Sequence, residues 1–411
     1  HFIFLFIGGF SIALAMQRWK LDVRLAGTVL SIAGNNPKLI IIGFMLSAAL
    51  LSAFISNTAT TAVMLPIGLS IILLFAKNDK DEFDNADQHN FTRCLLLCIA
   101  YSASIGGTMT LIGTAPNLFL ASFLEEGIPS QYKLRLSFIE WASFAAPLAI
   151  LFLPIIYLVL TKLIFPFDIN KLNKPKALEF TQQGKMDRGQ KITIIIFILT
   201  VLLWATRPLI QGITFGPEFE IYNPFSLLSD SGIAMIAAML LFVIPVNFKK
   251  RIFVMDWQTA TQLPWGIFIL FGGGLTLAKA IKDNGVAEFF AAQALLLPDL
   301  PGYIYVLIIV GSIIFLTELT SNTATTATLV PILASIAIGL NIHPYLFIFP
   351  ATLAASFAFM MPIATPPNTI VFASGHISIP EMCKAGFWLN IIGTIMITCY
   401  TYLVIKPVIG F

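Results

Sequence analysis

The chain has 411 residues, of which 57% are hydrophobic and 11% are charged. A soluble domain is about a quarter charged, so this composition excludes an ordinary water-soluble protein. The small formal net charge of +3 says nothing useful about nucleic acid, and we expect no nucleic-acid partner.

Apolar runs of 18 or more residues recur along the chain and predict an all-α integral membrane protein embedded in a lipid bilayer. In the first part we expect apolar segments at 2–17, 39–76, 94–123 and 142–165. In the second part we expect them at 191–208, 232–247, 264–281, 304–342, 344–373 and 386–409. Two stretches are predicted to lie along the membrane surface, 17–27 and 282–295. Because the chain opens inside an apolar run, we also expect native spans upstream of residue 1.

The two parts of the chain repeat each other in order. SNTATTAVMLPI (56–67) and SNTATTATLVPI (321–332) match at nine of twelve positions. A GG pair precedes each of them at equal distance, GTAPN (113–117) or ATPPN (364–368) follows, and Glu140 corresponds to Glu381. We therefore predict a first repeat over 1–165, a linker over 166–190 and a second repeat over 191–411.

The spans place the two repeats in opposite orientations. Five predicted spans in a complete half make an odd number, so the second half enters the membrane upside down relative to the first. Inverted repeats are typical of secondary transporters, and we expect no enzymatic activity. The most basic loops all fall on one side, which predicts a plasma (inner) membrane protein with a cytoplasmic linker and an external C-terminus.

Each SNTATT motif lies inside an apolar region too short for two comfortable spans. About 15 apolar residues flank the motif on either side, and as helix they reach about 23 Å, against a hydrocarbon core of roughly 30 Å. Two full spans joined by an aqueous turn are one interpretation. A re-entrant hairpin over 39–76 and another over 304–342 fits better, because both copies keep the same polar residues at the tip.

Two other apolar segments carry helix breakers. The segment 94–123 contains Gly106, Gly107, Gly113 and Pro116, and the segment 344–373 contains Pro362, Pro366 and Pro367. We predict that both are broken helices, because proline removes a backbone donor from the helical ladder. Hairpin tips and helix breaks that meet at the repeat interface would offer helix N-termini to carboxylates, and neutral oxygens to a small cation such as Na⁺. Glu318 is the main ionisable residue at this depth, as a functional group or as a support for its hairpin.

Paired SNT motifs, each followed by a broken segment with a T-x-P-N element, resemble the divalent anion/sodium symporter (DASS) family. Its members include the "I'm not dead yet" (INDY) dicarboxylate and citrate carriers. The resemblance covers the whole chain, including DWQTATQLPWGIFILFGGG (256–274) and ATPPNTIVFASG (364–375). It implies a homodimer in which a transport domain carries the site past a static scaffold, as an elevator.

The resemblance also implies the site residues. Substrate carboxylates would be held by Ser56, Asn57, Thr58, Thr114, Ser321, Asn322, Thr323, Thr365 and Pro366. One Na⁺ would be held by Ser52, Ser56, Asn57 and Gly113, and another by Thr317, Asn322 and Ala364. One departure from the pattern is Ala115, which stands where the second half has Pro366.

Two functions of this fold stay open. The first is sodium-coupled transport of C4 dicarboxylates (succinate, malate, fumarate) or related di- and tricarboxylates such as citrate. The second is sodium-independent exchange of dicarboxylates. The hydroxyl groups retained at Ser52 and Thr317 favour the first. The inverted pair argues against a channel, and an intramembrane enzyme is disfavoured because Glu318 has no evident catalytic partner.

Overall fold

The computed structural model describes residues 2–34, 36–76, 86–169, 172, 184–213, 223–294, 298 and 300–411. Within these residues the protein is almost entirely helical, as the composition predicts. A small antiparallel pair of strands, β1 (Pro245–Asn247) and β2 (Ile252–Phe253), was not predicted. Most of the predicted linker 166–190 lies outside the described residues.

The first repeat consists of α-helices and three short helical segments of other types. In chain order they are α1 (Phe2–Arg18), α2 (Leu21–Ala33), α3 (Pro37–Ser52), α4 (Asn57–Ala76), α5 (Ala86–Thr108), α6 (Ala115–Ser122), η1 (Phe123–Gly127), η2 (Ser130–Tyr132), α7 (Phe138–Leu158) and η3 (Val159–Ile164). The predicted hairpin therefore forms as α3 and α4, and the predicted broken helix forms as α5 and α6.

The second repeat follows the same plan after three additional helices, α8, α9 and the short α10. In chain order its elements are α8 (Arg188–Gln211), α9 (Asp230–Val243), α10 (Trp257–Ala260), α11 (Trp265–Asp283), α12 (Val286–Ala294), α13 (Gly302–Thr317), α14 (Asn322–Gly339), α15 (Tyr345–Ala354), α16 (Pro366–Phe372), α17 (Ile379–Tyr400), η5 (Thr401–Ile405) and α18 (Lys406–Ile409). Here α13 and α14 form the hairpin, and α15 and α16 form the broken helix.

By length and apolar composition, six helical stretches among the described residues could cross a membrane. They are 57–75, 86–108, 138–164, 188–211, 322–339 and 379–409, and a bent pair made of α1 and α2 would add a seventh. Both α4 and α14 are long enough to span as single helices. Helix length alone therefore does not distinguish a re-entrant hairpin from two full spans.

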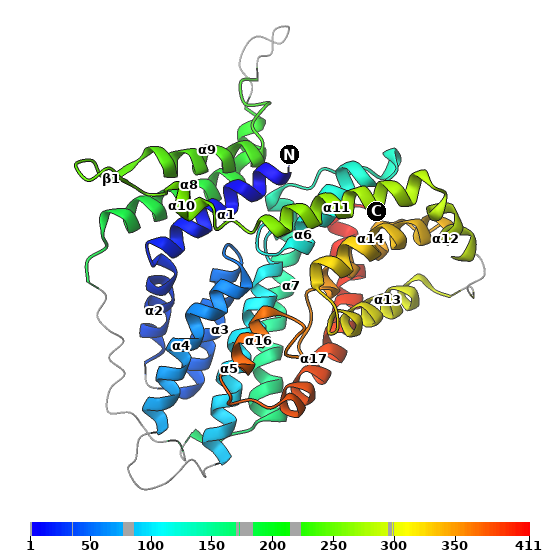
Figure 1. Cartoon of the computed structure of the whole chain (residues 1–411). Coiled ribbons are helices and arrows are strands. Elements are labelled where there is room, and N and C mark those ends of the chain that lie inside the picture. Colours follow the sequence, from blue (N-terminus) through cyan, green and yellow to red (C-terminus); the bar gives the residue numbers. More distant parts are fainter. Residues whose placement is uncertain are drawn as a thin grey trace.

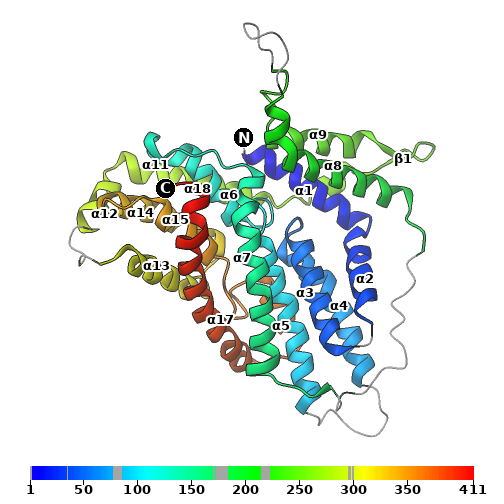
Figure 2. The ribbon, with the colours of Figure 1, turned by 180° about the vertical axis from the view of Figure 1, so that it is seen from behind.

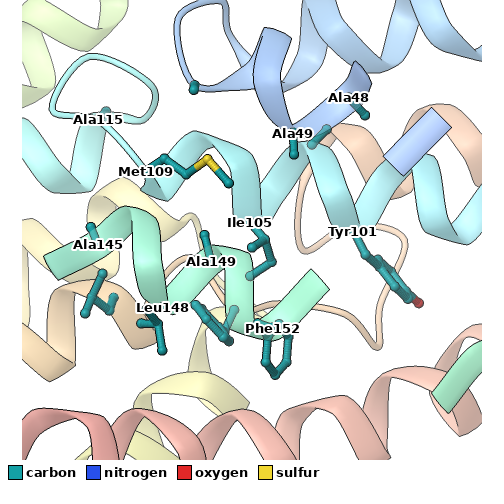
Figure 3. Close-up of a cluster of buried hydrophobic side chains, with 14 of the residues drawn as sticks. Ala48, Ala49, Tyr101, Ile105, Met109, Ala115, Ala145, Leu148, Ala149 and Phe152 are labelled. Atoms are coloured by element: carbon teal, nitrogen blue, oxygen red, sulfur yellow. The ribbon is translucent and has the colours of Figure 1, made fainter. Parts of the chain in front are cut away.

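Helix α5 lies at the centre of the molecule, because every residue from Cys94 to Thr108 is buried. Figure 3 shows Ile105 of α5, and Met109 directly after its end, beside α7, which contributes Leu148 and Ala149. On another side α3 lies so close that a methyl group on Gly106 would stand 2.3 Å from the Ala49 carbonyl oxygen. The core of the site-bearing part is thus built on close packing among α3, α5 and α7.

Three helices outside this core, α1, α8 and α9, form a second group. Figures 1 and 2 show α1, α8 and α9 running side by side and crossing the direction of α5 and α7. Helix α1 then bends by 73° into α2, which leads to the first hairpin. The chain therefore passes from this group into the site-bearing group through the α1–α2 elbow (residues 18–21).

The two repeats interlock through their short helices. Helix α4 of the first hairpin packs on α16 of the second repeat, and α14 of the second hairpin packs on α6 of the first. Figure 1 shows α16 lying close to α4 and α5. The aligned glutamates Glu140 and Glu381 have the same local role, since each closes a capping box at the start of its helix, with Ser137 and Ser378 respectively.

Candidate functional site

The first hairpin tip is the turn between α3 and α4. Helix α3 ends at Ser52, whose hydroxyl donates to the side-chain oxygen of Asn57 at 2.6 Å. Asn57 is the first residue of α4, and the Ala59 N–H donates to the Ser56 hydroxyl at 3.3 Å. Ser56 therefore caps the second arm in the way that serine commonly caps helices. The motif SNT thus marks a helix N-terminus.

The break in the first broken helix is held open by a side-chain amide. The Asn117 amide group donates to the carbonyl oxygens of Gly107 at 3.2 Å and Thr110 at 2.8 Å. These carbonyls have lost their helical partners, and a buried carbonyl needs a donor. The Asn117 side-chain oxygen is itself buried and accepts no hydrogen bond from the described residues. Asparagine in T-x-P-N therefore stabilises the break itself.

The first tip is seated directly on the first break. The Thr110 hydroxyl donates a short hydrogen bond to the Ala53 carbonyl oxygen in the tip. A methyl group on Gly107 would lie 2.3 Å from the side-chain oxygen of Asn57. Glycine is required at this position because any Cβ would displace the asparagine.

The second repeat builds the same arrangement with different atoms. The Thr317 hydroxyl lies 2.7 Å from the Asn322 side-chain oxygen and 2.9 Å from the Ala355 carbonyl oxygen. A hydroxyl has one proton to donate, so three oxygens share a single proton here. The Asn368 amide donates to the carbonyl oxygens of Ala358 at 3.2 Å and Met361 at 3.1 Å, as Asn117 does in the first half.

Glu318 is the largest difference between the repeats, since it occupies the position that corresponds to Ala53. Its carboxylate accepts the backbone N–H groups of Phe359 at 2.7 Å, Met360 at 2.9 Å and Met361 at 2.9 Å. It also accepts the side-chain amide of Asn390 in α17 at 2.8 Å. Four donors converge on one buried carboxylate, so Glu318 ties the second tip to the second break and to α17.

Four helix N-termini carry the predicted substrate residues. They are the starts of α4, α6, α14 and α16. The first three present backbone N–H groups with partial positive charge, whereas α16 begins with Pro366 and Pro367, which have no N–H, and its Asn368 N–H is already bonded to Thr365. Most of the predicted substrate residues are partly or fully exposed: Ser56, Asn57, Thr58, Thr114, Ser321, Asn322, Thr323 and Pro366. The exception is Thr365, which is buried and accepts the Asn368 N–H at 3.3 Å. Thr114, its counterpart, makes no capping bond with its side chain.

The predicted cation residues that are not also predicted to hold substrate lie deeper than most of the substrate residues. Ser52 and Thr317 are fully buried, and Gly113 and Ala364 are buried as well. Their oxygens are neutral, and no cluster of three or more His, Cys, Asp or Glu side chains suited to a metal occurs in the described part of the chain. Buried neutral oxygens of hydroxyl, amide and carbonyl groups are suitable ligands for a hard, singly charged cation.

The structure brings each tip to the break of its own half and each hairpin helix to the short helix of the other half. Sequence analysis missed two supporting residues, Thr110 and Asn390. Thr110 was visible as a hydroxyl inside the broken segment. Asn390 was visible as an amide inside an apolar helix, where an uncharged polar group needs a partner.

Comparison with known proteins matches residues 1–410 to the family model described as the sodium:sulfate symporter transmembrane region. The chain is 38% identical over 418 residues to the sodium-dependent dicarboxylate transporter SdcS of Staphylococcus saprophyticus, covering 99% of this chain and 77% of the relative. It is also 38% identical over 412 residues to the SdcS protein of Staphylococcus aureus strain USA300, with the same coverage.

Among solved structures, the YdaH transporter of Alcanivorax borkumensis is similar with a TM-score of 0.67 over 99% of this chain and 85% of that chain. The sequence identity is 12%, so this likeness concerns the fold alone. The family match over the full chain agrees with the paired SNT and T-x-P-N motifs and with the repeated tip-and-break geometry. The chain therefore belongs to the sodium:sulfate symporter family of membrane transporters, the divalent anion/sodium symporters.

Proposed function

We propose that the protein is a sodium-coupled transporter of C4-type dicarboxylates or related di- and tricarboxylates. The observation that carries the proposal is the duplicated tip, in which a buried hydroxyl meets the asparagine of each SNT motif, at 2.6 Å for Ser52 and 2.7 Å for Thr317. The relatives named sodium-dependent dicarboxylate transporter support the substrate class and the coupling ion.

The substrate's carboxylates would bind at the exposed ends of the four helix N-termini. The neutral donors would be Ser56, Asn57, Thr58 and Thr114 in one half, and Ser321, Asn322, Thr323 and Thr365 in the other. Pro366 has no N–H to donate and would only contact the substrate. Helix N-termini favour anions, although none of these proposed residues is an arginine or a lysine that could neutralise a dianion. Bound Na⁺ ions would supply that missing charge, which makes substrate binding depend on sodium.

Sodium ions would bind just behind the substrate. In the first half the ligands would come from Ser52, Ser56, Asn57 and Gly113. In the second half they would come from Thr317, Asn322 and Ala364. The three oxygens that share one proton at Thr317 support this assignment, because a cation would relieve their mutual repulsion.

The transport cycle would move the site-bearing group of helices past the group formed by α1, α8 and α9, in an elevator-type motion. We also propose a homodimer in the plasma membrane, with the linker 166–190 cytoplasmic and the C-terminus outside. Basic residues on the side of the linker support this orientation. The α1–α2 elbow is the connection that such a motion would have to accommodate.

Substitution of the two asparagines tests the proposed site. Asn57→Ala and Asn322→Ala should each abolish sodium-driven uptake of labelled succinate in proteoliposomes, while the protein remains folded and monodisperse. Asn284→Ala is the matched control, since Asn284 is exposed near the end of α11 and its side chain bonds only to its own helix. Near-normal uptake by either site variant would reject this site.

A further inference from the structure

The α1–α2 elbow is fixed to the start of α8. The Trp19 indole N–H donates to the Val254 carbonyl oxygen at 2.8 Å, and the Gln190 amide donates to the Trp19 carbonyl oxygen at 3.0 Å. Gly189 lets the ring of Trp19 approach α8, since a methyl group there would lie 2.2 Å from that ring. The elbow and the start of α8 are therefore joined, and two cavities, each lined by residues of both α2 and α8, lie between these helices. We call this space the groove.

A basic cavity of about 270 Å³ lies at one end of this groove. Lys20, Arg24 and Lys185 line it, and Asp187 is the one acid among the described residues of its lining. That acid already caps α8, because its carboxylate accepts the Gln190 N–H at 2.7 Å. Both lysines are exposed and free to turn toward a ligand. Three cationic groups against one committed carboxylate favour an anion.

The Arg24 side chain is held in a fixed position in this cavity by hydrogen bonds. Its guanidinium donates to the Gly184 carbonyl oxygen at 2.6 Å and to the Gln190 side-chain oxygen at 3.3 Å. A guanidinium has five N–H donors in a planar fork, so these two bonds leave donors for a phosphate. The cation is thus held in place before any ligand binds.

An apolar cavity of about 270 Å³ lies further along the same groove. Carbon-rich side chains of α1, α2, α3 and α8 line it, among them Met16, Leu25, Leu51 and Phe197. Leu25 directly follows Arg24 in α2. In α8, Phe197 stands two turns after Gln190 on the same face, which corresponds to about 10 Å along the helix. The two cavities therefore follow each other along one groove.

We propose that this groove binds an anionic phospholipid, with the phosphate headgroup in the basic cavity and an acyl chain in the apolar cavity. A free phosphate would use only the first cavity, and a neutral lipid would use only the second. The exposed apolar face of α8, with Ile195, Ile198 and Leu199, places the groove beside hydrocarbon rather than water. Basic pockets next to membrane helices are the chemistry that recognises anionic headgroups.

The bound lipid would contact both groups of helices. Its acyl chain would touch α8 on one side and Leu50, Leu51 and Phe54 of the first hairpin on the other. Phe54 already packs edge-on against Phe197 at 4.9 Å between ring centroids. Occupancy of the groove would therefore strengthen the contact between α8 and the first hairpin tip.

Binding to delipidated protein, followed by native mass spectrometry, tests the proposal without relying on transport. Phosphatidylglycerol and phosphatidylcholine of equal chain length are the probes. The double variant Lys20→Gln/Lys185→Gln should lose phosphatidylglycerol affinity about thirtyfold, because each lysine near an anionic headgroup contributes roughly one fivefold step. Lys249→Gln/Lys250→Gln is the matched control, since these exposed lysines lie outside both cavities and carry the same charge.

Three results would overturn the proposal. The first is an equal loss of affinity in the two double variants, which would mean a general charge effect. The second is binding of phosphatidylcholine as tight as that of phosphatidylglycerol, which would mean that the basic cavity does not recognise the negative charge of the headgroup. The third is glycerol phosphate binding as tightly as the lipid, which would mean a headgroup site without an acyl-chain site.

Discussion

Glu318 holds the second break in place, and Glu318→Gln tests how much this contact contributes to the free energy of unfolding. Four donors meet the carboxylate, namely three backbone N–H groups (Phe359, Met360 and Met361) and the Asn390 amide. The glutamine side chain offers one oxygen and one NH₂ group. Its oxygen can serve the three donors that now share Oε1, so the NH₂ group must face the N–H of Met361.

The expected cost follows from these contacts. One buried N–H without a partner costs about 1–3 kcal/mol, and a hydrogen bond to a charged acceptor is worth roughly 1 kcal/mol more than a neutral one. Burying a neutral amide instead of a carboxylate offsets part of this loss. We therefore expect Glu318→Gln to lower the free energy of unfolding by at least about 2 kcal/mol.

Thermal unfolding of the purified protein in detergent measures this effect. Glu126→Gln is the matched control, because Glu126 is exposed and the same atom exchange there should leave stability unchanged. If Glu318→Gln unfolds at the temperature of the wild type, the carboxylate does not support the break and the reasoning fails. If both variants are destabilised equally, the loss is not specific to this contact.

Three further predictions concern the first tip and the start of α10. Gly107→Ala should impair transport and lower the free energy of unfolding by about 1–3 kcal/mol, because its methyl group would meet Asn57. Gly273→Ala is the control and should be tolerated, because the space around Gly273 is open. Uptake and the unfolding temperature are measured for both variants. Ser52→Ala should weaken the sodium dependence of uptake more than its substrate selectivity, and an unchanged sodium titration would remove Ser52 from the cation ligands. The N3 backbone N–H of α10 holds the pKa of Asp256 below its usual value, so its stabilising effect is complete above about pH 4 and is lost as the pH falls through the lowered value. The free energies of unfolding of the wild type and of Asp256→Asn, measured between pH 3 and pH 7, should therefore become equal only at the acid end. The same difference between them at every pH would contradict this.

The repeated motifs predicted the local chemistry of the site better than its supports. Equal spacing before each SNT motif was enough to pair Ser52 with Thr317. In the structure each of these hydroxyls bonds to the asparagine of its own SNT motif. The breaks were predictable because proline and glycine interrupt a helix by their own backbone chemistry. Local signals of this kind depend on residues that are close in sequence.

The supports could not be predicted because their partners are distant or belong to the backbone. Asn390 lies 72 residues from Glu318, and the other donors to this carboxylate are N–H groups that every residue type carries. The packing of α4 on α16 joins opposite halves, and no sequence pattern specifies it. The strands β1 and β2 are too short to show an alternating pattern.

The most direct test of the proposed function is uptake of labelled succinate by proteoliposomes that contain the protein. Uptake is compared between an inward Na⁺ gradient and K⁺ or choline in place of Na⁺, with empty vesicles and with vesicles loaded with succinate. Our account predicts concentrative uptake into empty vesicles only when Na⁺ is present outside. Uptake that requires internal succinate and is indifferent to Na⁺ would contradict it and would identify an exchanger.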